Sequence, residues 1–83
     1  MRLSKAQRAV LERMAAGEKL HWAGGYDPYA FWHDGRGWRE PVPWGTFGAL
    51  ERRGLVARPS YAALDGLCTL TPAGRAALGE AGK

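Results

Sequence analysis

Few side chains in this sequence could act in catalysis or bind a metal ion, and their spacing fits no familiar site. The candidate metal ligands are His21, His33, Cys68, Asp27 and Asp34. No Cys-x-x-Cys, His-x-x-x-His or His-Glu-x-x-His spacing occurs among them. No nucleophile motif surrounds Ser4 or Ser60, and no glycine-rich loop leads into the Lys-Ser/Thr pair of a phosphate-binding loop. We therefore expect a protein that is not an enzyme and that carries no metal and no cofactor.

Positive charge is the chemistry that the sequence does offer. Its 83 residues include 12 Lys and Arg against 8 Asp and Glu, which gives a net charge of +4. This favours an anionic partner such as nucleic acid, or an acidic protein surface, although plain soluble domains can carry it too. No apolar run approaches the ~20 residues of a membrane span, and the N-terminus has no apolar signal core. The single cysteine, Cys68, forms no internal disulfide, so the expected location is the cytoplasm, away from any membrane.

The segment at residues 42–58, VPWGTFGALERRGLVAR, predicts a short helix that runs directly into a strand. Pro43 suits a first helical turn, where its missing N–H costs little. Gly54 suits the turn that ends a helix. Leu55 and Val56 then favour a strand. We expect a helix at residues 43–53 and regard it as the element that the rest of the chain supports.

The outward face of this helix combines very small residues with arginine. At about 100° per residue, Gly45, Ala49 and Arg52 lie opposite the apolar stripe, with Thr46 and Arg53 on a flank. Small side chains let another surface come close, and the arginines supply positive charge for it. If that surface is DNA, the residues expected to contact base edges or phosphates are Thr46, Arg52, Arg53, Arg58, Ser60 and Tyr61. If it is a protein, the docking face of the helix is Gly45, Gly48 and Ala49.

Aromatic residues are concentrated in the middle of the chain, where eight of the nine lie between residues 22 and 47. Tyr29, Phe31 and His33 alternate with Ala30 and Trp32, so both faces of this predicted strand carry rings. Burial in the core ranks first among the uses of these rings. A protein interface, with Trp32 and Trp38 as its anchors, ranks second. Stacking on the bases of a single strand ranks third, and the cations that would assist it are Lys19, Arg36 and Arg39.

Two family resemblances follow from these segments. LERRGLV at residues 50–56, followed after a wing-sized gap by LTPAGRAAL at residues 70–78, resembles winged helix-turn-helix proteins of the MarR-like kind. The opening LSKAQRAVLERMAAG, followed shortly by KLHW, resembles the YjhX family of small bacterial proteins. The first resemblance implies a DNA-binding winged helix. The second implies a first helix, a hairpin, a recognition-type helix and a wing, and that family is associated with inhibition of a DNA topoisomerase as a toxin.

The predicted fold is a single α+β domain over residues 1–83. It is a winged helix-turn-helix with a β-hairpin inserted between the first helix and the recognition-type helix. The expected elements are a helix at 5–16, an aromatic hairpin at 19–41, the recognition-type helix at 43–53, a wing at 55–70 and a last helix at 72–78. In the wing, residues 55–58 should pair with residues 67–70.

The function expected from these features is binding to double-stranded DNA, as a bacterial or phage transcriptional regulator that blocks or recruits polymerase, most readily as a homodimer. The alternative is a winged-helix protein-interaction module that inhibits a nucleic-acid enzyme, either as a toxin or as a phage-encoded inhibitor of a host machine. Its partner would be a protein component of a nucleic-acid machine. Loss of DNA binding after charge reversal of the arginines would support the first; a greater effect of the Trp32 or Trp38 ring would support the second.

Overall fold

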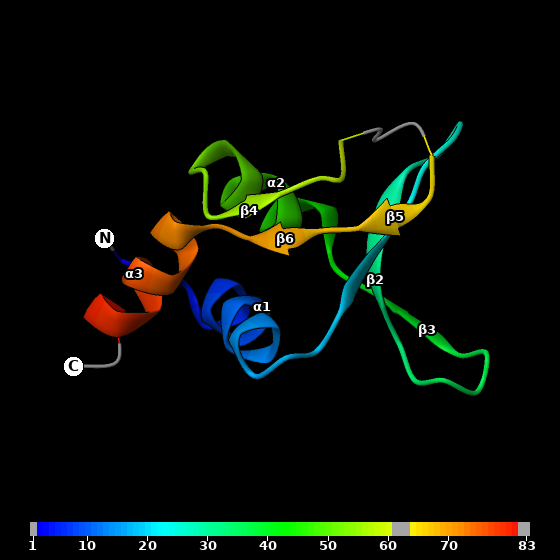
Figure 1. Ribbon diagram of the computed structural model, residues 1–83. Helices are drawn as coiled ribbons and strands as arrows, with labels where there is room; N and C mark the ends of the chain where they lie inside the picture. Colours follow the sequence, from blue (N-terminus) through cyan, green and yellow to red (C-terminus); the bar gives the residue numbers. More distant parts are fainter. Residues whose placement is uncertain (1, 61–63, 82–83) are drawn as a thin grey trace.

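Within residues 2–60 and 64–81, which the computed structural model describes, three helices alternate with short antiparallel strands (Figure 1). The elements are α1 (Lys5–Ala15), β1 (Leu20–Ala23), β2 (Tyr29–His33), β3 (Arg39–Pro41), α2 (Trp44–Arg52), β4 (Val56–Ala57), β5 (Gly66–Leu67), β6 (Thr69–Leu70) and α3 (Pro72–Ala81). This arrangement confirms the α+β class. Across the same residues, no helix is both long enough and apolar enough to cross a membrane.

The predicted ends of α1 and α2 lie within one residue of the observed ends. The Ser4 hydroxyl accepts a hydrogen bond from the Gln7 N–H, and the Gln7 side chain accepts one from the Ser4 N–H, each at 3.1 Å. This capping box starts α1. α2 is shorter than predicted by one residue at each end, because Pro43 has an extended backbone and Arg53 is the C-cap.

The end of α2 is the Schellman motif that Gly54 predicts. Gly54 has a positive φ of 72°, and its N–H donates to the Glu51 carbonyl at 3.0 Å. The next N–H, of Leu55, donates to the Leu50 carbonyl at 3.0 Å. These two bonds satisfy carbonyls that the helix leaves without partners and send the chain directly into β4.

The predicted aromatic hairpin at 19–41 is a three-stranded antiparallel meander. β1 pairs with β2, with His21 opposite Phe31, and β2 pairs with β3, with Phe31 opposite Pro41. β5 joins the other edge of β1, so the sheet order is β3-β2-β1-β5. The meander therefore becomes the larger part of a four-stranded sheet.

The predicted wing is divided between two sheets. β4 pairs with β6, with Val56 opposite Leu70, which is the pairing expected for residues 55–58 and 67–70. That ladder is short, however, because Leu67 pairs with His21 of β1 instead, and the Cys68 N–H donates to the Leu20 carbonyl at 2.8 Å. Because the residues of the predicted wing are divided between two sheets, the winged helix-turn-helix interpretation stays a prediction.

The start of α3 is fixed by Thr71 and by close packing on the end of α2. The Thr71 hydroxyl accepts from the Gly74 N–H at 3.0 Å, as expected of a capping residue, and it also donates to the Gly54 carbonyl at 2.6 Å. A Cβ at Gly74 would lie 2.3 Å from the Leu55 carbonyl oxygen. The helix continues to Ala81, beyond the predicted end at residue 78.

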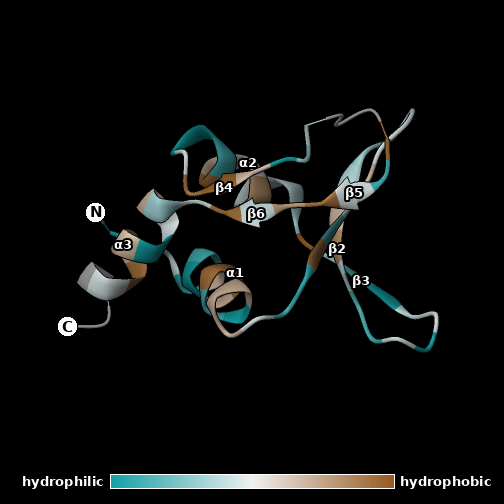
Figure 2. Cartoon of the chain, in the orientation of Figure 1, coloured by the Kyte–Doolittle hydropathy of each residue, from teal (hydrophilic) through white to brown (hydrophobic). Residues whose placement is uncertain are grey.

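One face of the four-stranded sheet and the two helices α1 and α2 enclose the core. Trp22 and Phe47 pack with ring centroids 5.5 Å apart, and both are buried. Trp32 is 6% exposed, beneath the Arg13 guanidinium, whose carbon lies 4.1 Å from the ring centroid. Trp32 is thus a core residue, which corrects its assignment as an interface candidate. Figure 2 shows hydrophobic stretches on α1 and β4 and a hydrophilic β3.

Candidate nucleic-acid interface

The exposed face of α2 has the composition that the sequence predicts. Gly45 is exposed, and a Cβ placed there would meet nothing within 4 Å. Gly48 and Ala49 are half-buried, and the Arg52 side chain lies over Gly48, with Nη1 3.4 Å from a Cβ built there. Among the described residues Arg52 has no hydrogen-bond or ion-pair partner. This arginine therefore remains available to bind an anion.

Arg53 is exposed but already bound within the protein. Its Nη1 donates to the Arg2 carbonyl at 3.1 Å and to the Gln7 side-chain oxygen at 3.4 Å. These bonds tie the C-terminal end of α2 to the first turn of α1 and to Arg2, which precedes it, and they bring the backbone of Arg2 to the basic end of α2. Both acceptors are neutral, so the positive charge of Arg53 is not cancelled.

Arg58 differs, because an acidic residue of α2 already neutralises it. Its guanidinium forms a two-pronged ion pair with Glu51, in which Nη2 lies 2.7 Å from Oε1 and Nε contacts Oε2. The guanidinium carbon also lies 4.9 Å from the Trp22 ring centroid and 5.8 Å from that of Trp44. The hydrogen bonds that Arg58 donates to the Glu51 carboxylate raise the pKa of Arg58 above its usual value. Its predicted role as a phosphate contact therefore competes with an internal partner.

The remaining predicted DNA contacts are dispersed. Thr46 is half-buried and lines a small depression with Val10 and Trp32, on the side of α2 that faces α1 and β3. It does not share a surface with Arg52. Ser60 is exposed in the loop after β4. Tyr61 lies outside the described residues.

A second cluster of functional side chains lies on the outer face of the four-stranded sheet, opposite the core. His21 of β1 and Phe31 of β2 stand opposite one another, and their rings stack with centroids 5.3 Å apart and planes within 16°. The guanidinium carbon of Arg39, from β3, lies over Phe31, 4.6 Å from the ring centroid. The row His21, Phe31, Arg39 therefore crosses three strands.

Tyr29 and His33 flank this row along β2. The Tyr29 ring lies 5.3 Å from Phe31, and its hydroxyl accepts a hydrogen bond from Arg39 Nη1 at 3.1 Å. The His33 ring lies 5.9 Å from His21 and 6.5 Å from Phe31. Phe31 is only 6% exposed although it lies outside the core, because its neighbours on the outer face cover it. The alternation of Tyr29, Phe31 and His33 predicted their common face; the contribution of His21 and Arg39 required the strand register.

An open depression of about 570 Å³ adjoins this cluster. Its lining combines rings and cations with an acidic edge: Lys19, His21, Trp22, Ala23, Phe31, His33, Arg39, Asp65, Gly66 and Leu67. The Asp65 carboxylate is held at that edge because its Oδ1 accepts from the Gly24 N–H at 3.1 Å. This surface can offer stacking, positive charge and a hydrogen-bond acceptor together.

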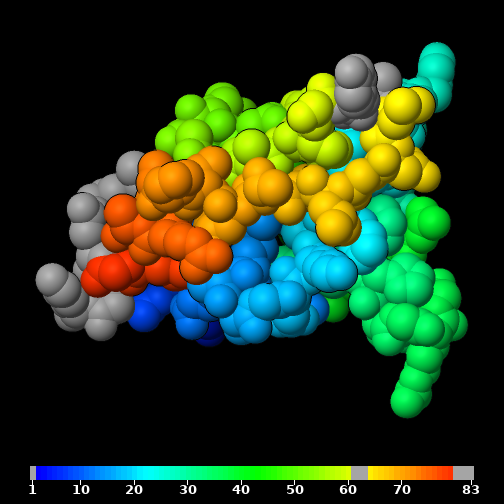
Figure 3. Space-filling model, in the orientation of Figure 1, coloured from blue at the N-terminus to red at the C-terminus, as the bar shows by residue number. Residues whose placement is uncertain are grey.

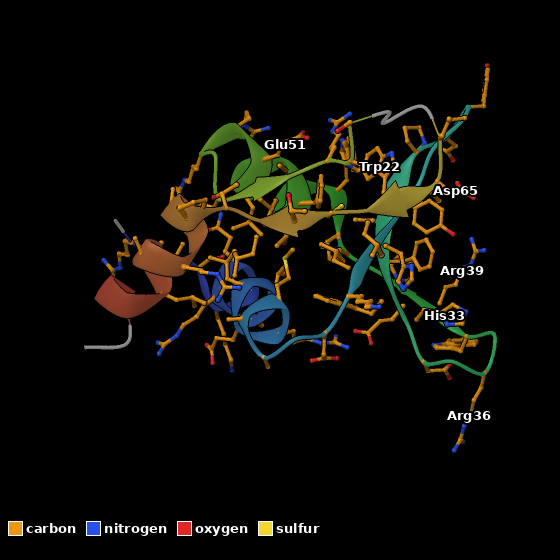
Figure 4. All side chains as sticks on the ribbon, viewed as in Figure 1. Trp22, His33, Arg36, Arg39, Glu51 and Asp65 are labelled. Atoms are coloured by element: carbon orange, nitrogen blue, oxygen red, sulfur yellow. The ribbon has the colours of Figure 1, made fainter. Side chains whose placement is uncertain are left out.

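The hairpin between β2 and β3 projects from the body of the protein (Figure 3). It carries Trp38, which is exposed. The Asp34 carboxylate accepts from the Arg36 N–H at 2.7 Å and from the Trp38 N–H at 3.1 Å, and these two hydrogen bonds close the turn. Trp38 is 71% exposed, and the Arg36 side chain points away from the body at the hairpin tip (Figure 4). Trp38 therefore remains accessible as an interface candidate.

The structure offers little for metal or thiol chemistry. In residues 2–60 and 64–81, no three His, Cys, Asp or Glu side chains gather as metal ligands. Cys68 is buried, and this burial raises the pKa of its thiol to about 12. Since the thiolate is the reactive form, Cys68 is unreactive near neutral pH.

The fold and these surfaces define a small basic α+β domain whose accessible chemistry is that of arginine and aromatic rings. Comparison with protein-family models, with curated proteins and with solved structures finds no match.

Proposed function

We propose that this chain is a small DNA-binding protein that places the exposed face of α2 against the backbone of duplex DNA. The observation that carries this proposal is the combination on one helix face of Gly45 and Gly48 with Arg52, which has no partner among the described residues. A glycine face lets the helix axis come close to the phosphates. Arg52 and Arg53 then supply charge at the point of closest approach.

Contacts of this kind give affinity with little sequence discrimination. Gly45, Gly48 and Ala49 have no side-chain groups that can hydrogen-bond to base edges, so most of the binding free energy would come from phosphate contacts. A transcriptional regulator of this design would occupy its site through charge and DNA shape, and a homodimer would double the number of phosphate contacts.

The proposal is tested by fluorescence anisotropy of labelled random-sequence duplex DNA. With two phosphate contacts, from Arg52 and Arg53, the dissociation constant should rise about tenfold between about 50 and about 200 mM salt. Arg52→Glu should abolish binding with the fold retained. Arg75→Glu is the matched control, because Arg75 is exposed on α3 and the variant changes the net charge equally. Equal loss in both variants, or no binding by the unmodified protein at low salt, would refute the proposal.

A second candidate function is docking onto a protein of a nucleic-acid machine, and the exposure of two tryptophans favours it. Trp38 is 71% exposed and Trp44 is 52% exposed, whereas tryptophan is usually well buried unless it anchors an interface. Under this alternative, Trp38→Ala would abolish capture of the partner while Arg52→Glu would leave it intact. The opposite result would support DNA binding.

A further inference from the structure

We propose that the outer face of the four-stranded sheet binds single-stranded nucleic acid, with one unpaired nucleotide seated in the depression between His21 and Asp65. This site is separate from the exposed face of α2 and does not rest on the proposed binding of duplex DNA. It is assigned from the stacked row His21, Phe31, Arg39 and from the charges that border it.

The stacked row explains why the occupant should be a flat ring. The rings of His21 and Phe31 are nearly parallel, and the Arg39 guanidinium lies over Phe31, so two stacked rings and a cation already lie together across the sheet. A planar ligand seated against His21 continues this row at the depression. Aromatic rings on a sheet surface bind bases in this way regardless of sequence, since every base offers a π face.

The charges around the depression explain why the ring should belong to a nucleotide. Lys19 and Arg39 lie among its lining residues, at positions able to attract phosphate. Across the depression, Asp65 Oδ1 is held by Gly24, while Oδ2 has no partner within the described part of the chain. A carboxylate oxygen there can accept a hydrogen bond from the N–H groups of a base. Cations on one side and an acceptor on the other match a nucleotide better than a simple anion or an apolar peptide.

The shape of the site selects an unpaired strand over a duplex. In a duplex both faces of each base are already stacked, so a base would have to leave the helix to reach the row. The depression is open to solvent. On the same face of the sheet, Tyr29 and His33 of β2 add further rings on either side of Phe31. A strand can therefore continue beyond the seated nucleotide.

The test uses the full chain and a labelled oligothymidylate of about ten nucleotides, a length within the range that such surfaces cover. Anisotropy should show binding that weakens with salt. His21→Ala should raise the dissociation constant at least about fivefold, which corresponds to the lower limit for loss of one base–aromatic stack. Lys19→Glu should weaken binding more than Arg75→Glu, which makes the same charge change on exposed α3. Circular dichroism checks that each variant is folded.

Arg52→Glu separates this proposal from the binding of duplex DNA. It should leave oligothymidylate binding intact even where it abolishes duplex binding. The site would be overturned if the oligonucleotide did not bind at low salt, or if His21→Ala and Lys19→Glu both bound it as tightly as the unmodified protein does. Thymidine monophosphate that binds as tightly as the oligonucleotide would overturn its assignment to a strand, because a free nucleotide would then suffice.

Discussion

Replacing Gly74 with alanine should destabilise the protein more than any other glycine-to-alanine change in α3. The Cβ would lie 2.3 Å from the Leu55 carbonyl oxygen and 2.6 Å from a methyl carbon of Leu70. This backbone oxygen of Leu55 accepts a hydrogen bond from the Thr71 N–H at 3.1 Å. The oxygen therefore cannot move away from the new Cβ without loss of that bond. Overpacking of this kind costs about 1 to 3 kcal/mol.

Gly79 provides the matched control, because it lies in the same helix and a Cβ there would meet nothing within 4 Å. Gly79→Ala should gain up to about 1 kcal/mol from the better helix propensity of alanine. For a domain of this size, each kcal/mol corresponds to about 4 to 8 °C in melting temperature. Gly74→Ala should therefore melt well below the unmodified protein and Gly79→Ala at or above it. If Gly74→Ala melts no lower than the unmodified protein, the close packing of α3 on Leu55 is wrong.

Three further predictions concern individual side chains. Glu51→Gln should release Arg58 from its ion pair. If Arg58 then contacts phosphate, the slope of log Kd for duplex DNA against log salt should steepen by about 0.9. An unchanged slope would place Arg58 outside the interface. Trp32→Ala should lower the free energy of unfolding in urea by about 3 to 5 kcal/mol, whereas Trp38→Ala should stay within about 0.5 kcal/mol of the unmodified protein, and equal effects would contradict their assigned burial. The Cys68 thiol should resist alkylation at mildly alkaline pH until urea unfolds the protein, because burial raises its pKa to about 12. Above the ordinary thiol pKa, the folded state keeps a proton that the unfolded state releases. The free energy of unfolding should therefore fall as the pH rises from the ordinary thiol pKa toward 12.

The sequence predicted those parts of the fold that local interactions decide. Ser4 and Gln7 are three residues apart, so their reciprocal capping could be recognised directly from the sequence. Gly54 could be assigned to the end of α2 because a left-handed residue is needed there, and Thr71 to the start of α3 because its hydroxyl caps the first turn. Each depends on neighbours within one helical turn.

The parts that the sequence did not predict depend on contacts between distant segments. The burial of Trp32 follows from which face of β2 meets α1, and alternation alone left both faces possible. The ion pair of Arg58 with Glu51 requires β4 to fold back alongside α2. The row that includes His21 and Arg39 depends on the register of three strands. Within the candidate sites, alternation predicted the common face of Tyr29, Phe31 and His33, but it could not show that His21 and Arg39 join them. The roles of Arg52 and of the glycine face stay predictions.

The division of residues 66–70 between two sheets also has a consequence for how the chain folds. The pairing of β5 with β1 places Gly66 opposite Trp22, 44 positions earlier in the chain. β6 follows β5 closely and pairs with β4. Closing so long a loop is entropically costly and slows folding. Until it closes, β1 has an unpaired edge that can pair with another chain. The last third of the chain therefore protects the meander against aggregation, and both sheets should be lost in one cooperative transition.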